Sequence, residues 1–280
     1  MAVSKVIRPV NIFELYIKAS LHVALAVTAF AYVSVMELGL SPDYFLFGFI
    51  FSSTVLSYNL TKYITLATRD SISVSPLLKW IGIVTAGSFC VVLALLFYLP
   101  RDTIIAAAGL GILTIAYAIP ISEGRKNLRN IYGIKIGVIA LVWAGVTVGL
   151  PVLNHGMESL PTAGVVIEAV QRLLLVGILI IPFDIRDYRS DELTLGTLPQ
   201  IIGVKETKIL GLILLSGCLL LEGIQQPPLS GSFLIFGIIA VVAALMVRRS
   251  MVIQSAYFAS FWVEGIPIVW AVLLILFDIF

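Results

Sequence analysis

Long uncharged apolar runs recur along the whole chain, and they restrict its fold more than any other feature. Six runs come close to the roughly 20 residues that a helix needs to cross the hydrocarbon core of a bilayer; they cover residues 19–36, 44–61, 80–100, 103–122, 136–154 and 223–247. Three more runs are apolar but interrupted by charged residues, at about 163–183, 206–224 and 254–278. The pattern predicts an all-α protein with nine transmembrane helices.

Composition agrees with a membrane location. Apolar residues make up 60% of the chain and charged residues 12%, with a mean hydropathy of +1.07. A soluble domain carries about 25% charged residues. Linkers rich in Ser or Pro, low-complexity tracts and an evident internal repeat are all lacking, so we expect residues 1–280 to form a single integral membrane domain.

The distribution of basic residues predicts the orientation. With nine spans, sixteen of the eighteen Lys and Arg residues fall on the side that holds the N-terminus, whereas Arg101 falls on the other side and Arg172 within a span. The positive-inside rule then places the N-terminus and the loop that begins at Asp184 in the cytoplasm. The first apolar run is too long for a cleavable signal peptide. We expect a multi-pass protein of the plasma (inner) membrane, in contact with membrane lipids.

Three carboxylates follow the apolar segment that ends at Phe183. Asp184, Asp187 and Asp191 are spaced by three and four residues, so a helix continuing past Pro182 would align them on one face. Carboxylates packed this closely need a cation or solvent to stabilise them, and acidic residues at a membrane boundary indicate a functional site. Oxygen ligands at this spacing suit Mg²⁺, which commonly uses one or two carboxylates together with substrate phosphates.

Other kinds of site find little support in the sequence. Cys90 and Cys218 lie in predicted spans without CxxC spacing, and we interpret them as buried small hydrophobes. His22 and His155 cannot form a zinc site between them, and His22 is interpreted as a satisfied polar residue facing the bundle. A Gly-rich phosphate loop, a nucleophile elbow and a nucleic-acid-binding module are absent from the sequence, so no nucleic-acid partner is expected.

Two sets of polar residues lie inside predicted spans. Glu168 and Arg172 are four residues apart and can pair along one helix face, which lowers the cost of placing each in lipid. We interpret them as a structural pair near the outer boundary. Glu264 has no local partner in sequence, and the choice between a bond to a neighbouring helix and a place in a cavity stays open.

The acidic segment resembles a known motif. Asp184-Ile-Arg-Asp187-Tyr-Arg-Ser-Asp191, followed by Gly196-Thr-Leu-Pro199 and Gly203, is similar to the second aspartate-rich motif of the UbiA superfamily of intramembrane prenyltransferases. The loop after the fourth span resembles the same family through Tyr117, Pro120, Arg125, Lys126, Asn127 and Gly133. Nine helices with cytoplasmic acidic loops match as well.

The family's first motif, NDxxDxxxD, is degenerate here. Asn59 matches, but Leu60, Tyr63 and Ala67 stand where the family has aspartates. These three side chains cannot ligate Mg²⁺ as a carboxylate does. Asp70 lies three residues beyond the last of these positions, and would need a change of helix register.

Basic residues offer a partial replacement for the missing aspartates. Lys62 and Arg69 lie in the loop that lacks them, and positive side chains can stabilise the developing charge of a diphosphate leaving group. Alternatively, both residues mark only the cytoplasmic boundary.

The resemblance implies an activity and a set of residues. It implies transfer of a prenyl group from a polyprenyl diphosphate to a lipophilic or aromatic acceptor, assisted by Mg²⁺. Asp184, Asp187 and Asp191 would hold the metal and act in catalysis, Asn59 would orient the donor, and the diphosphate would be bound by Lys62, Lys126, Arg186 and Arg189. The alternatives are a non-catalytic isoprenoid- or lipid-binding pseudoenzyme of the same fold, and a transporter, for which no paired broken helices are evident.

Overall fold

The computed structural model describes residues 11–67, 75–118, 133–156, 162–189 and 196–279, and within these ranges the chain forms helices and no strand. In order along the chain the helices are α1 (Ile12–Lys18), α2 (Leu21–Glu37), α3 (Tyr44–Ala67), α4 (Pro76–Leu95), α5 (Arg101–Ala118), α6 (Ile134–Ala144), α7 (Leu150–His155), α8 (Thr162–Asp187), α9 (Leu198–Ile202), α10 (Val204–Gln225), α11 (Gly231–Arg249) and α12 (Ile266–Ile279). Two π-helical segments, Gly145–Gly149 and Phe258–Val263, precede α7 and α12.

Several of these helices can cross a membrane. Among the described residues, six helical segments are long and apolar enough, and α1 with α2, bent by 58°, raises the number to seven. The six are Pro76–Tyr98, Ile134–His155, Thr162–Asp187, Val204–Gln225, Gly231–Arg249 and Phe258–Phe277. The other long helices are α3 and α5, so the all-helical membrane fold is confirmed while the count of nine spans stays a prediction.

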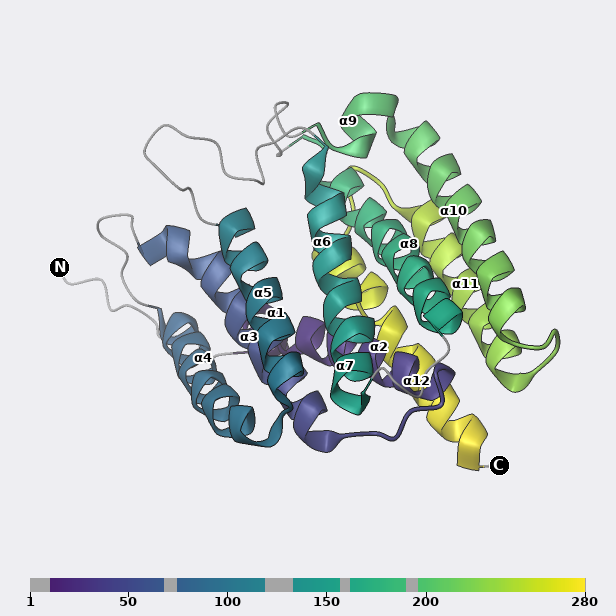
Figure 1. Cartoon of the computed structure of the whole chain (residues 1–280). Helices are drawn as coiled ribbons and strands as arrows, with labels where there is room; N and C mark the ends of the chain where they lie inside the picture. The colour runs from purple at the N-terminus through teal and green to yellow at the C-terminus, as the bar shows by residue number, and fades with distance from the viewer. Residues whose placement is uncertain (1–10, 68–74, 119–132, 157–161, 190–195, 280) are drawn as a thin grey trace.

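The long helices form a closed arrangement in which α12 packs against α2. From α6 the contacts run through α8, α10, α11 and α12 to α2, which also packs on α3 and on the π-helical segment Gly145–Gly149. Contacts of α5 with α3 and with α7 close the circuit, and α4 lies outside against α3. Figure 1 shows α4 and α5 on one side and α10 and α11 on the other.

Polar residues in the short connections fix where helices begin. The Asn11 carboxamide accepts the backbone N–H groups of Phe13 and Glu14 at the start of α1, and Asp43 accepts those of Phe45 and Leu46 at α3. Ser75 and Ser230 cap α4 and α11 in the same way. Each cap satisfies backbone donors that the first helical turn leaves without intrahelical partners.

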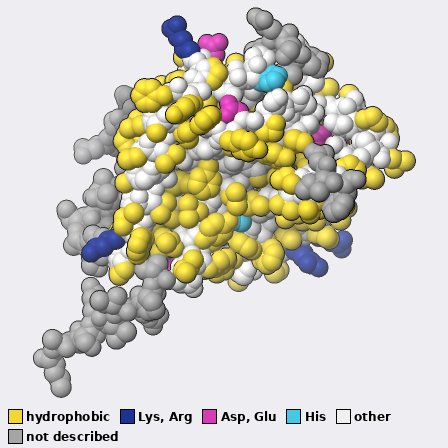
Figure 2. Space-filling model, turned by 90° about the horizontal axis from the view of Figure 1, so that it is seen from below, with side chains coloured by type: hydrophobic (Ala, Val, Ile, Leu, Met, Phe, Trp, Pro, Cys, Tyr) yellow, Lys and Arg dark blue, Asp and Glu magenta, His cyan; other side chains and the backbone are white. Residues whose placement is uncertain are grey.

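The interior and the surface are both apolar, as expected for a protein dissolved in lipid. The main core joins α2, α8, α10, α11 and α12 around Phe30, Phe236 and Trp270. The outer faces expose rows of large apolar side chains, among them Ile83, Phe89 and Leu93 on α4 and Ile213 and Leu220 on α10. Seen from below the view of Figure 1, hydrophobic side chains cover most of the surface and charged ones are few (Figure 2). Exposed apolar area this extensive indicates a membrane environment.

The predicted pair on α8 is confirmed. Arg172 and Glu168 form an ion pair with both side chains about 1% exposed. The Arg172 guanidinium also donates to the Ser34 hydroxyl and stacks 4.2 Å from the centre of the Phe30 ring. These contacts stabilise two charges that would otherwise be costly inside the bundle.

Candidate functional site

A cavity of about 400 Å³ lies between α3, α6, α8 and the segment that joins the second π-helical turn to α12. We call it the main cavity. Its charged lining residues are Lys62, Lys135, Asp184, Arg186, Asp187 and Glu264. Its aromatic and aliphatic lining includes Tyr58, Trp143, Val176, Leu179, Phe183 and Val263. Five of the six charged residues lie near the end of α3, the start of α6 or the end of α8, and we call this part the charged end. The combination of a charged part with apolar lining suits an amphiphilic ligand.

The end of α8 brings two of the predicted aspartates to this cavity. The helix continues past Pro182 as far as Asp187, so Asp184 and Asp187 lie one turn apart, as the spacing predicted. Asp184 is fully buried, and its Oδ1 atom lies 2.9 Å from the ammonium nitrogen of Lys135 at the start of α6. This ion pair joins two helices whose sequences give no sign that they meet.

Asp187 is more accessible and has a basic partner of its own. Both of its carboxylate oxygens accept hydrogen bonds from Arg186, from Nε at 2.7 Å and from Nη2 at 2.9 Å. The Arg186 guanidinium lies 5.2 Å from the centre of the Phe183 ring. Arg186 is therefore held in the cavity by both charge and ring contact.

Lys62 lies where α3 meets the main cavity. Its side chain is exposed, and the ammonium group donates a hydrogen bond of 2.9 Å to the Ser20 hydroxyl. It lies 5.7 Å from the centre of the Tyr58 ring, one turn earlier on the same helix. The position leaves the charge available to a ligand.

Asn59 has a different environment from the one that the resemblance implies. It is 2% exposed and does not line the main cavity. Its amide nitrogen donates to the Ala19 carbonyl and the Thr85 hydroxyl, and its oxygen accepts from Ser20. The carboxamide thus fastens α3 to α4 and to the turn before α2.

The remaining predicted residues are Arg189, Lys126, Asp191 and Arg69. Arg189 is exposed on the turn that follows α8. Lys126, Asp191 and Arg69 fall outside the described residues, so their predicted roles stay predictions.

The sequence did not predict Lys135 as a site residue, and for Glu264 it left open the choice between a bond to a neighbouring helix and a place in a cavity; both residues line the main cavity. The position of Lys135 shortly after Gly133, which has a φ of +75°, indicates a helix start and nothing more. Glu264 ends the π-helical segment Phe258–Val263. A Cβ at Gly265 would lie 2.7 Å from the Phe261 carbonyl oxygen, so glycine permits this turn, and it places Glu264 in the cavity. π-helical turns are frequent at functional sites.

His22 supports the same segment. Its Nε2 lies 2.9 Å from the Phe261 carbonyl oxygen, which can only accept, so Nε2 carries the proton. The Nδ1 atom then accepts from the Tyr16 hydroxyl at 2.9 Å. The ring is a satisfied polar group, as the sequence suggested.

The described side chains do not make a complete metal site by themselves. Within the described ranges, no three His, Cys, Asp or Glu side chains could hold a metal ion together. Asp187 is the accessible carboxylate, and Asp184 could join it only if Lys135 moved. A Mg²⁺ ion here would need further oxygens, such as those of a phosphorylated substrate.

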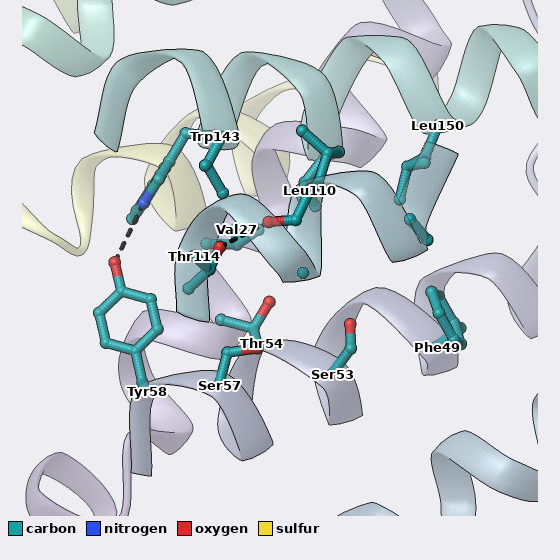
Figure 3. A pocket seen from close by; sticks show the side chains of 14 residues that line it. Val27, Phe49, Ser53, Thr54, Ser57, Tyr58, Leu110, Thr114, Trp143 and Leu150 are labelled. Atoms are coloured by element: carbon teal, nitrogen blue, oxygen red, sulfur yellow. Dashed lines mark hydrogen bonds between the residues drawn. The ribbon is translucent and has the colours of Figure 1, made fainter. Parts of the chain in front are cut away.

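A second, smaller space lies between α2, α3, α5 and α6. It measures about 110 Å³, and we call it the inner pocket. Figure 3 shows the side chains that surround it, with Phe49 and Leu150 at one end and Tyr58 and Trp143 at the other. Trp143 donates a hydrogen bond of 3.0 Å from its indole nitrogen to the Tyr58 hydroxyl.

No protein-family model and no curated protein sequence matches the chain. A solved structure does: the apo structure of a UbiA homolog from Aeropyrum pernix K1, with a TM-score of 0.65 and 15% sequence identity. The match covers 92% of this chain and 98% of that protein. The chain therefore has the fold of this UbiA homolog over nearly its whole length.

Proposed function

We propose that the chain is a divergent UbiA-type prenyltransferase that binds a polyprenyl diphosphate in the main cavity. The observation that carries the proposal is the cavity's division into a charged end, with Lys62, Lys135 and Arg186, and an apolar remainder. A prenyl diphosphate has the same two parts. The fold shared with the UbiA homolog supports the proposed binding of a prenyl diphosphate.

The charge balance of the cavity indicates how the diphosphate binds. The described lining has three basic and three acidic side chains, so its formal charge is zero. A diphosphate brings several negative charges, and a neutral site in low dielectric does not stabilise them. Mg²⁺ entering with the diphosphate would supply the missing positive charge, with Asp187 as the accessible protein ligand. Arg186, released from Asp187, would then donate to the phosphate oxygens.

The proposed reaction needs little covalent chemistry from the protein. The bond between the prenyl C1 atom and the diphosphate oxygen breaks, and its electron pair leaves with the diphosphate. The ring face of Phe183, which lies beside Arg186, would stabilise the allylic cation. A nucleophilic atom of the acceptor then bonds to C1 and loses its proton. Glu264 would take this proton, because Asp184 is engaged with Lys135 and Asp187 would be engaged with Mg²⁺.

A second function is favoured by one observation. Asp184 is held by Lys135, and the first aspartate-rich motif lacks its carboxylates. A protein with this arrangement could bind an isoprenoid diphosphate, or a related lipid, without turning it over.

The two functions are separated by measuring release of the diphosphate. Purified protein in lipid nanodiscs is incubated with geranylgeranyl diphosphate, Mg²⁺ and an extract of membrane lipids, with Asp187→Asn as the control. Prenyltransfer predicts released diphosphate and a new prenylated lipid, both absent in the control. Binding without release supports the non-catalytic function. If the wild-type protein did not bind geranylgeranyl diphosphate, both proposed functions would be contradicted.

A further inference from the structure

The main cavity and the inner pocket are separated by two side chains. Tyr58 and Trp143 line both spaces. Tyr58 comes from α3 and Trp143 from α6, and the 3.0 Å hydrogen bond between them bridges the two helices. Figure 3 shows the bond at one end of the inner pocket. The pair therefore forms part of the wall between the two spaces.

The pair lies at the depth that the far end of a bound chain would reach. Trp143 is eight residues after Lys135 on α6, which is about 12 Å along the helix axis. Leu150, at the far end of the inner pocket, is seven residues further, or roughly 10 Å. A ligand anchored by its phosphates near Lys135 would therefore extend toward Trp143 first, and toward the inner pocket beyond it.

The inner pocket suits an apolar occupant. Its walls include Val27, Phe49, Leu110 and Leu150. The hydroxyls of Thr54 and Thr114 are satisfied by carbonyl oxygens of their own helices, at 2.7 and 2.8 Å, so they do not require a polar ligand. A dry apolar cavity of roughly 150 Å³ binds benzene. A pocket of about 110 Å³ is therefore close to the size of one isoprene unit.

We infer that the Tyr58–Trp143 pair limits the length of the prenyl chain, and that the inner pocket receives an additional isoprene unit when the pair is opened. This inference rests on the proposed binding of a prenyl diphosphate. It assigns specificity to two residues that take no part in anchoring the phosphates. Tyr58 and Trp143 act here by closing the end of the main cavity.

The test measures the affinities of farnesyl, geranylgeranyl and geranylfarnesyl diphosphate for each variant at fixed Mg²⁺. Affinity should rise with each added isoprene unit up to a limiting chain length. We expect this limit to be one unit longer in Trp143→Ala than in the wild type. The gain for that unit should be roughly tenfold or more, since buried methylene groups favour binding strongly. Tyr58→Phe, which removes the hydrogen-bond acceptor but keeps the ring, should give a smaller shift in the same direction.

Two further variants serve as controls. Trp80→Ala removes a half-exposed tryptophan from α4 and should leave the length preference unchanged. Gly111 lines the inner pocket with open space at its Cβ position, so Gly111→Leu should fill the pocket. Added to Trp143→Ala, it should restore the wild-type preference.

The readout is a ratio of affinities within one variant, so partial loss of folded protein does not alter it. An unchanged preference in both Trp143→Ala and Tyr58→Phe, with normal binding by the wild type, would overturn the inference and leave the proposed function intact. Absence of binding by the wild type for all three chains would overturn both.

Discussion

Lys135 and Asp184 are 49 positions apart in sequence and 2.9 Å apart in space, and the pair joins the start of α6 to the end of α8. Both side chains are almost completely buried. Removing one partner of a buried ion pair leaves an uncompensated charge, which typically costs about 3–5 kcal/mol, whereas replacing both by apolar residues is often neutral. The pair is therefore a strong coupling between the two helices that frame the main cavity.

Thermal unfolding in detergent should reveal this coupling. We expect Lys135→Met and Asp184→Leu each to lower the melting temperature clearly. The double variant should melt nearer to the wild type than either single variant does. Additive losses in the double variant would contradict a direct pair.

Asn59 should behave as a structural residue. Asn59→Ala leaves the Ser20 and Thr85 hydroxyls and the Ala19 carbonyl without their buried partner. An unsatisfied buried group costs about 1–3 kcal/mol, so stability should fall. The fraction that remains folded should bind geranylgeranyl diphosphate as the wild type does. A lower affinity at unchanged stability would instead place Asn59 in contact with the donor.

Removal of Mg²⁺ should weaken diphosphate binding. The described charges of the main cavity balance, so a diphosphate needs an accompanying cation. We expect titrations in excess EDTA to show at least a roughly tenfold loss of affinity, in line with the strength of charge-assisted contacts. Asp187→Asn should reduce the Mg²⁺ dependence. Equal affinities with and without Mg²⁺ would indicate that basic side chains alone bind the diphosphate.

The predicted orientation can be tested at two exposed positions. Lys79 lies near the start of α4, and Asp102 lies beyond the other end of α4, near the start of α5. In a background without Cys90 and Cys218, Lys79→Cys should react with an impermeant thiol reagent only in opened cells. Asp102→Cys should react in intact cells. The reverse pattern would invert the assigned topology.

The sequence predicts the helices well because their signal is local. The apolar run at 163–183 becomes α8, and the spacing of Asp184 and Asp187 places them one turn apart at its end. Contacts between distant helices carry no such signal. Nothing in the sequence pairs Lys135 with Asp184 or Trp143 with Tyr58.

Residue type alone also does not show whether a polar side chain points into a cavity or bonds to a neighbouring helix. Asn59 matches the family motif, yet its side chain is used by neighbouring helices. In the sequence, Glu264 is an isolated charge in a predicted span. In the structure, the preceding π-helical turn places Glu264 in the main cavity. Such turns depend on close packing, as at Gly265 and His22, and have no simple sequence pattern.

Substitution of Lys62 can show whether the charged end of the main cavity binds a diphosphate, as we propose. Geranylgeranyl diphosphate is titrated at fixed Mg²⁺ into the wild type, Lys62→Glu and Lys79→Glu. Lys62 lines the cavity, whereas Lys79 is an exposed lysine on α4 that does not. A direct charge-assisted contact is worth about 1.5–3 kcal/mol, so Lys62→Glu should weaken binding by roughly tenfold or more while Lys79→Glu leaves it unchanged. Equal affinities for all three proteins would contradict the claim.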